Sequence, residues 1–106
     1  MPRTIGTRVF AAQKADDSTV YLYGHGVYEG DFEPPIPPLG GTWDEFDEMG
    51  RGILGDDYQR PTNPRILLDS GEYVWGMQCW WGNDSRFDEF VNGRQIVEVP
   101  VENLLE

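Results

Sequence analysis

The chain contains 106 residues, of which 39% are hydrophobic and 13% aromatic. These proportions exclude a disordered polypeptide and suffice for one modest core, so we expect a single domain over residues 1–106. The 19 acidic and 8 basic side chains give a formal net charge of −11. A surface of that sign repels a phosphate backbone, which disfavours direct binding of DNA or RNA.

The sequence carries no signal for a membrane or for an oxidising compartment. No apolar run reaches the roughly 18 residues that a membrane-spanning helix needs, and residues 1–13 lack the apolar stretch of a secretion signal. The single cysteine, Cys79, allows no internal disulfide. We therefore expect a protein of the reducing cytoplasm that does not associate with a membrane.

The first third of the chain predicts strands. Residues 4–13 alternate weakly between apolar and polar side chains, and the polar residues 14–18 follow as a turn. Residues 19–24, TVYLYG, are β-branched and aromatic, which suits a half-buried strand. Glycines on both sides of His25 predict a bulge or sharp bend before the next strand-like segment at 27–31.

Residues 32–64 form a long region rich in proline, glycine and acids. Its first part, FEPPIPPLGG, lacks the backbone donors of an inner strand and predicts an extended surface loop. A short helix is predicted over residues 42–49, because Thr42 and Glu45 have the spacing of a capping box. A stripe of apolar side chains is typical of a helix that lies on the core, and here it comprises Trp43, Phe46 and Met49.

The second half predicts a hairpin, a short helix and a last strand. Asp-Ser-Gly at 69–71 is a plausible tight turn between the strand-like segments 65–69 and 72–80. A helical turn or two is predicted within residues 83–93, and RQIVEV at 94–99 alternates as a strand. The expected fold class is mainly β: a small bent antiparallel sheet or an SH3-like barrel with one or two short helices.

Two blocks of the chain resemble small uncharacterised proteins of actinobacteria and their phages. The blocks are VYLYGHGVYEGDFEPP and NPRILLDSGEYVWGMQCWWG, which together cover 36 of the 106 residues. The shared features are a glycine-punctuated strand pair, an Asn-Pro-led hairpin and a Trp-Gly…Cys-Trp-Trp-Gly motif. The resemblance implies an actinobacterial or phage setting, with the host-cell cytoplasm as the compartment of a phage protein. It implies no catalytic residues.

Residues that could perform chemistry are few. His25 and Cys79 are the strongest candidates for a base and a nucleophile, but Cys79 lies among aromatic residues, where a small buried thiol commonly fills a core. Asp56 and Asp57 could serve a hydrolase, although nothing near them specifies their roles. The sequence has no zinc spacing, calcium loop or glycine-rich phosphate loop. We therefore expect no metal, no cofactor and no enzymatic activity.

The stretch EYVWGMQCWWGND, residues 72–84, holds three of the four tryptophans. Alternation along it places one set of side chains on one face and the rest on the other: Tyr73, Trp75, Met77, Cys79 and Trp81 against Val74, Gly76, Gln78 and Trp80. The first face is the expected core. We expect Trp80 to be only partly buried, because it shares its face with the bare Gly76 and the polar Gln78.

The leading hypothesis is a non-enzymatic binding protein that captures a small planar anionic ligand, such as a nucleotide-like signal, in phage counter-defence. Aromatic rings would stack on the ligand, and arginines would bind its phosphate or carboxylate. The candidate ligand-binding residues are Tyr23, His25, Tyr28, Arg65, Gln78, Trp80 and Arg86.

Two alternatives use other surfaces. An acidic protein–protein inhibitor would present carboxylates to a basic host factor, through Asp44, Glu45, Asp47 and Glu48. A structural or assembly protein would use the aromatic face as an interface between copies of the chain.

Overall fold

The computed structural model describes residues 4–37 and 40–101. The strands are β1 (Arg8–Ala15), β2 (Thr19–Phe32), β3 (Asn63–Leu68), β4 (Tyr73–Trp75), β5 (Trp80–Asn83) and β6 (Gln95–Glu98). The α-helices are α1 (Trp43–Leu54) and α2 (Phe87–Val91), and the 3₁₀ segments are η1 (Gly55–Asp57), η2 (Gly76–Gln78) and η3 (Asp84–Arg86).

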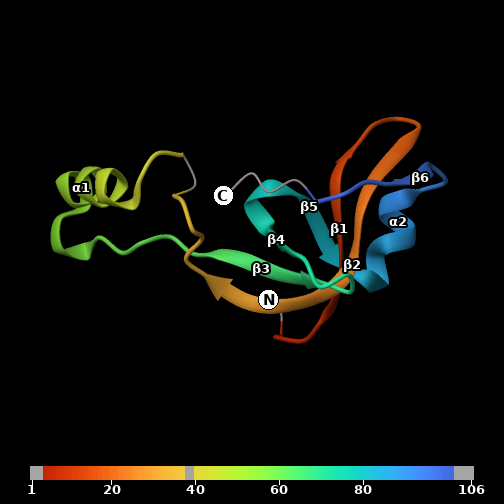
Figure 1. Cartoon of the computed structure of the whole chain (residues 1–106), viewed down its shortest axis with the longest axis horizontal. Helices are drawn as coiled ribbons and strands as arrows, with labels where there is room; N and C mark the ends of the chain where they lie inside the picture. Colours follow the sequence, from red (N-terminus) through yellow and green to blue (C-terminus); the bar gives the residue numbers. More distant parts are fainter. Residues whose placement is uncertain (1–3, 38–39, 102–106) are drawn as a thin grey trace.

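The strands form one bent, unclosed sheet in the order β4-β3-β2-β1-β5, with antiparallel neighbours (Figure 1). The short β6 adds in parallel to the beginning of β2, on the same edge that β3 occupies further along that strand. The predicted mainly β fold with short helices is confirmed. The sequence predicted either a bent sheet or an SH3-like barrel. The structure has the bent sheet, because β4 and β5, the strands at the two ends of the order, do not pair within the described residues and so do not close a barrel.

The middle of β2 carries the predicted bend. Ala11 and Ala12 of β1 face Gly24 and Leu22 of β2, so one residue of β2 is left over as a bulge. Gly24 has a φ of 146°, a conformation that favours glycine. Gly26 is needed for a different reason: a Cβ there would lie 2.1 Å from the backbone oxygen of Leu67 in β3.

Both faces of the sheet are covered, so there are two apolar clusters. The cluster on one face comprises Val9, Ala11, Tyr28, Ile66, Leu68 and Val74, with Cys79 and Trp81 packed against it. The cluster on the other face comprises Phe10, Ala12, Val20 and Leu22, against which Phe87 and Phe90 of the α2 segment pack. Successive residues of β1 point to opposite faces, which explains why a run of four is buried.

The predicted strand over residues 72–80 is broken. It ends at Trp75, and the 3₁₀ turn η2 follows because the Gln78 side-chain oxygen accepts the Trp75 backbone N–H at 2.9 Å. The turn interrupts the alternation of side chains between the two faces, so the residues before it and those after it no longer follow one pattern. Val74 is therefore buried and Tyr73 exposed, the reverse of the prediction, whereas Trp81 packs on the core as predicted.

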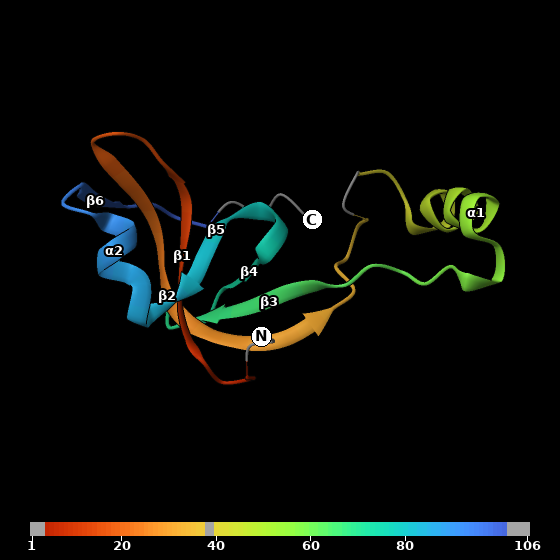
Figure 2. The ribbon, with the colours of Figure 1, turned by 180° about the vertical axis from the view of Figure 1, so that it is seen from behind.

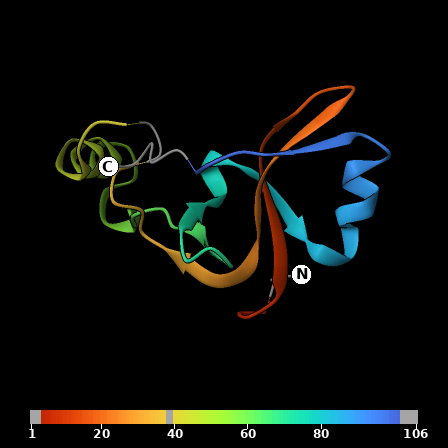
Figure 3. The ribbon, with the colours of Figure 1, turned by 45° about the vertical axis from the view of Figure 1, so that its right-hand side comes forward.

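Helix α1 does not lie on the core, contrary to the expectation from its apolar stripe. It lies at one end of the molecule, beyond the ends of β2 and β3, and α2 and β6 lie at the other end (Figures 1, 2 and 3). The molecule is accordingly elongated, with extents of 48 × 26 × 26 Å. We name the described residues between β2 and β3, 33–37 and 40–62, the helical arm.

The start of α1 follows the prediction, and its end does not. The Thr42 hydroxyl accepts the Glu45 backbone N–H at 3.2 Å, so the predicted N-cap is present. The helix continues to Leu54, beyond the predicted end at residue 49. Residues 33–37 of the proline-rich segment before it have no regular structure. Pro34 and Pro37 are fully buried, so these residues are not a purely superficial loop.

Polar contacts hold the helical arm together. The Asp47 carboxylate, in a residue only 5% exposed, accepts hydrogen bonds from Tyr58 Oη at 2.6 Å and Arg60 Nη2 at 2.7 Å. The Trp43 indole N–H donates to the Pro34 backbone oxygen at 2.9 Å, and the Arg60 guanidinium lies over the Trp43 ring. These contacts fix the side of α1 that faces the rest of the arm.

Candidate functional site

The seven predicted ligand-binding residues do not form one site. Tyr23 and His25 line a pocket beside β2, and Arg86 lines a groove beside α2. The other four residues line neither cavity.

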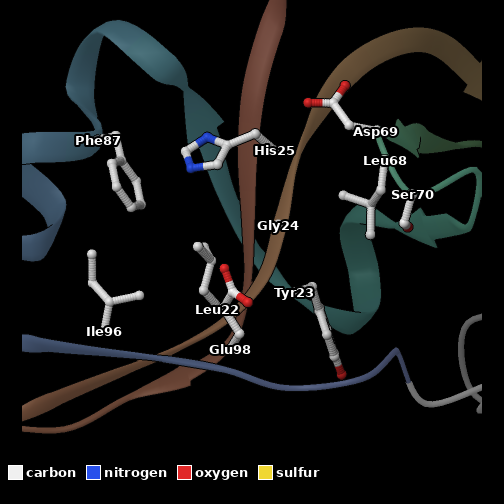
Figure 4. Close-up of a pocket in the computed structure, with 10 residues that line it drawn as sticks. All are labelled: Leu22, Tyr23, Gly24, His25, Leu68, Asp69, Ser70, Phe87, Ile96 and Glu98. Atoms are coloured by element: carbon white, nitrogen blue, oxygen red, sulfur yellow. The ribbon is translucent and has the colours of Figure 1, made fainter.

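The first pocket has a volume of about 360 Å³ and lies along β2, between the end of β3 and β6. Leu22, Phe87 and Ile96 form apolar walls, and His25, Asp69 and Glu98 supply polar groups (Figure 4). Two carboxylates in the lining make this pocket a poor match for an anionic ligand. Tyr23 and His25 therefore line a different pocket from Arg86.

His25 belongs to a network of charged side chains. Its Nδ1 lies 2.8 Å from Asp84 Oδ1, and its ring meets Phe87 edge-on with centroids 4.6 Å apart. Arg8 donates two hydrogen bonds to Asp69, both at 2.7 Å, and these hold the pKa of that carboxyl below its usual range. The network ties β1 and β2 to η3 and to the β3–β4 turn, so it stabilises the fold around the pocket.

The side-chain hydrogen-bond partner of His25 within the described residues is the Asp84 carboxylate. A histidine held by a carboxylate can accept a proton from a nucleophile, but within the described residues no serine or cysteine is hydrogen-bonded to it. Cys79 donates its thiol to the Trp75 backbone oxygen at 3.3 Å. Burial raises the pKa of the Cys79 thiol to about 12, so at neutral pH it is not the thiolate that a nucleophile requires.

The second cavity is a groove of about 480 Å³ between β5 and α2. Phe10 and Phe90 line it with their rings 4.8 Å apart between centroids. The Phe10 ring lies over Gly82, where an added Cβ would be 3.3 Å from Phe10 Cε1. The remaining lining residues are Trp81, Asn83, Arg86 and Glu89. Arg86 is exposed, and within the described residues its guanidinium forms no ion pair or hydrogen bond.

Trp80 lies beside this groove. It is 65% exposed, and it pairs with Ala12 while Gly82 pairs with Phe10. Residues directly opposite each other in antiparallel strands share a face, as do residues two apart in one strand. Trp80 and Gly82 therefore lie on the face that carries Phe10. The predicted exposure of Trp80 is confirmed, but its bare neighbour is Gly82; the predicted one, Gly76, lies in η2 against the Trp81 ring nitrogen.

Three of the predicted ligand residues have structural roles instead. Tyr28 is buried, stacks on Trp81 with centroids 5.7 Å apart, and donates its hydroxyl to Asp31. Gln78 caps η2 through the Trp75 N–H. Arg65 lies on β3 and does not line the groove. It donates to Glu29 at 3.1 Å, and its guanidinium lies over the rings of Phe32 and Tyr73.

The acidic residues predicted to contact a protein partner differ in their exposure to solvent. Asp44, Glu45 and Glu48 are exposed on α1. Asp47 is buried, and hydrogen bonds from Arg60 and Tyr58 hold its pKa below the ordinary range. Asp47 therefore stabilises the arm and cannot present its charge to a partner.

Sequence reasoning missed Gly82, Phe10 and Phe90 as groove residues. The pattern Trp80-Trp81-Gly82 contained a signal, because Trp80 and Gly82 are two apart and share a face in any strand. The contribution of Phe10 had no such signal, because it depends on the pairing of β1 with β5, about 70 residues apart in the chain.

No family model, curated protein or solved structure matches the chain. Over residues 4–37 and 40–101, no three His, Cys, Asp or Glu side chains come together in a way that could hold a metal ion. In the same part of the chain, no helix has the length and apolar character needed to cross a membrane.

Proposed function

We propose that this protein is a non-enzymatic binding protein that captures a small planar anionic ligand, of the nucleotide class, at Trp80 and the groove between β5 and α2. The observation that carries the proposal is the exposed Trp80 indole on the same sheet face as Phe10, with Arg86 in the adjoining groove.

Each of these residues suits one part of such a ligand. A base ring can stack on the exposed Trp80 indole, an interaction worth about 1–3 kcal/mol for a nucleobase on an aromatic side chain. The absence of a side chain at Gly82 lets the Phe10 ring pack on β5, where it lines the groove as an apolar wall for the ligand. The Arg86 guanidinium can donate paired hydrogen bonds to a phosphate.

The charge of the protein limits the ligand that fits. The net charge of −11 opposes a multiply charged anion at long range, and Glu89 lines the groove close to Arg86. A nucleoside monophosphate or cyclic nucleotide carries one or two negative charges near its ring and is repelled less than a triphosphate. We therefore expect affinity to fall from cyclic nucleotides to triphosphates of the same base.

The resemblance to actinobacterial and phage proteins supports a biological setting for this binding. A phage protein that removes a signalling nucleotide from the host cytoplasm would silence a defence response without any chemical reaction. The proposed role is therefore counter-defence by sequestration.

Calorimetric titration with a panel of nucleoside mono- and triphosphates and cyclic nucleotides tests the proposal. We expect Trp80→Ala to lower the affinity for the tightest ligand by at least about fivefold, from the stacking energy, and Trp80→Phe to retain most of it. Arg86→Ala should also weaken binding, whereas Arg65→Ala, an arginine outside the groove, should not. If no nucleotide binds, or if Trp80→Ala binds as the unaltered protein does, the proposal is wrong.

A further inference from the structure

The helical arm leaves one side of α1 apolar and open to solvent. Ile53 is 76% exposed, and Met49 and Leu54 are exposed beside it. With Phe46, Tyr58 and Pro61 these residues line a groove of about 470 Å³ on the arm. We name this the arm groove. An exposed apolar patch of contiguous large side chains is typical of an interaction site in a soluble protein.

The contacts of the arm hold this side of the helix outward. Trp43, Asp47 and Gly50 are spaced at i, i+4 and i+7 and face Tyr58 and Arg60 of the returning segment. Phe46, Met49 and Ile53, spaced at i, i+3 and i+7, share the adjacent side of the helix. The arm groove is thus fixed in orientation, at the end of the molecule away from the sheet (Figure 1).

Three carboxylates flank the arm groove. Glu45 lies one helical turn before Met49, and Asp56 and Asp57 belong to η1, between the lining residues Leu54 and Tyr58. Five acidic residues of α1 and η1 are exposed, and none of them forms an ion pair within the described part of the chain: Asp44, Glu45, Glu48, Asp56 and Asp57. The only basic residue of α1 is Arg51. Asp44 and Glu48 lie on the side of α1 opposite the groove lining, so the negative charge that flanks the groove comes from Glu45, Asp56 and Asp57.

This charge decides what can cover the groove. A second copy of the chain would bring the same carboxylates against these and a further net charge of −11, so association of two arms is opposed. An anionic lipid surface is opposed for the same reason, because helices that lie on such surfaces carry lysine and arginine on their polar face. The complementary occupant is apolar at its centre and basic at its edges.

We propose that the arm groove docks a basic amphipathic helix of a partner protein. Apolar side chains of that helix, spaced at i, i+3, i+4 and i+7, enter the groove between Met49, Ile53 and Tyr58. Its lysines and arginines meet the exposed carboxylates of α1 and η1, which set the orientation and accelerate association. This docking does not depend on the ligand groove, which lies beside α2 at the other end of the sheet (Figure 3).

The probe for this proposal is a synthetic, fluorescently labelled peptide of about 18 residues with leucine at the i, i+3, i+4 and i+7 positions and lysine elsewhere. Fluorescence anisotropy with the full chain measures its binding. A peptide of the same composition in scrambled order, which has no apolar side, should bind at least about tenfold more weakly. Equal binding of the two peptides would show attraction by charge alone and would overturn the proposal.

A matched pair of variants locates the peptide. Ile53→Asp places a charge in the arm groove and should lower the affinity at least about tenfold, since it removes an exposed aliphatic side chain that the bound peptide would cover. Ile5→Asp adds the same charge at a residue of similar exposure, 70%, outside the arm and should change the affinity less than about twofold. Similar losses in both variants would overturn the proposal. Leu54→Ala, which adds no charge, should also weaken binding.

A charge-reversal variant tests the second half of the proposal. Asp56→Lys combined with Asp57→Lys should weaken peptide binding and reduce its dependence on salt, because two of the carboxylates that flank the groove are reversed. Asp17→Lys with Asp88→Lys changes the net charge equally at two exposed residues outside the arm and is the control. An equal effect of the two double variants would show that only net charge matters. Circular dichroism of every variant confirms that the fold is retained.

Discussion

The Tyr58 ring lies so close to Gly50 in α1 that a Cβ at Gly50 would be 2.2 Å from Tyr58 Cε2. This contact explains a glycine in the interior of a helix, where glycine normally costs about 1 kcal/mol relative to alanine. The same ring carries the hydroxyl that donates to Asp47. The position of α1 in the arm therefore depends on the absence of a side chain at Gly50.

Gly50→Ala should loosen the arm, although alanine favours helix formation. Tyr58 would have to move away, and its hydrogen bond to Asp47 would be lost. Gly52→Ala is the matched control, because a Cβ at Gly52 meets nothing within 4 Å. It should slow amide hydrogen exchange in α1 about fivefold, the equivalent of about 1 kcal/mol. Exchange in Gly50→Ala should be faster than in the unaltered protein; a slowing in both variants would contradict this account.

The arm should lose stability in acid through Asp47. Hydrogen bonds from Arg60 and Tyr58 keep the pKa of Asp47 below its ordinary value of 3.8, so the unfolded arm binds the proton more tightly than the folded arm. The stabilisation is therefore complete above about pH 5 and is lost as the pH falls through the native pKa. NMR spectra of α1 recorded between about pH 6 and pH 2 should show this transition.

Asp47→Asn replaces the carboxylate that Tyr58 and Arg60 bind, so its α1 spectra at neutral pH should already resemble those of the unaltered protein in acid. The variant should lack the acid transition, because residue 47 can no longer be protonated. The control is Asp44→Asn, an exposed acid of the same helix, which should titrate as the unaltered protein does. An unchanged acid transition in Asp47→Asn would assign the effect to another carboxylate.

Cys79 should resist alkylation in the folded protein. With the pKa of its thiol raised to about 12 by burial, the thiolate fraction at pH 8 is about a thousandfold below that of a thiol with the ordinary value of 9.0. Iodoacetamide should therefore label Cys79 slowly in buffer and rapidly in denaturant, as mass spectrometry can measure. Rapid labelling of the folded protein would show that Cys79 is accessible and ionised.

Trp80 and Trp81 should differ in what they contribute to stability. Trp80→Ala should change the free energy of unfolding by less than about 0.5 kcal/mol, because the indole is mostly in solvent. Trp81→Ala should cost about 3 kcal/mol, because it removes the ring that stacks on Tyr28 and packs on the core. Urea unfolding of both variants measures the difference. Equal losses would mean that Trp80 is part of the core and not available to a ligand.

The short-range features of this fold could be predicted from the sequence. The Thr42 cap, the turn after β3, the bend around His25 and the exposure of Trp80 depend on residues within a few positions of one another. Strand alternation, capping and turn chemistry act over that range. The sequence therefore determined that the chain is mainly β and that one tryptophan faces solvent.

The tertiary structure alone decided which elements meet. Asp47 resembles its exposed neighbours in sequence, and its burial follows from Tyr58 and Arg60 after the helix. The aromatic stripe of α1 predicted a helix on the core, yet the arm covers a different side and leaves Ile53 in solvent. The groove beside Trp80 exists because β1 pairs with β5 and brings Phe10 to Gly82. Periodicity shows that one side of an element is apolar; what covers that side depends on contacts between distant segments, which no local pattern records.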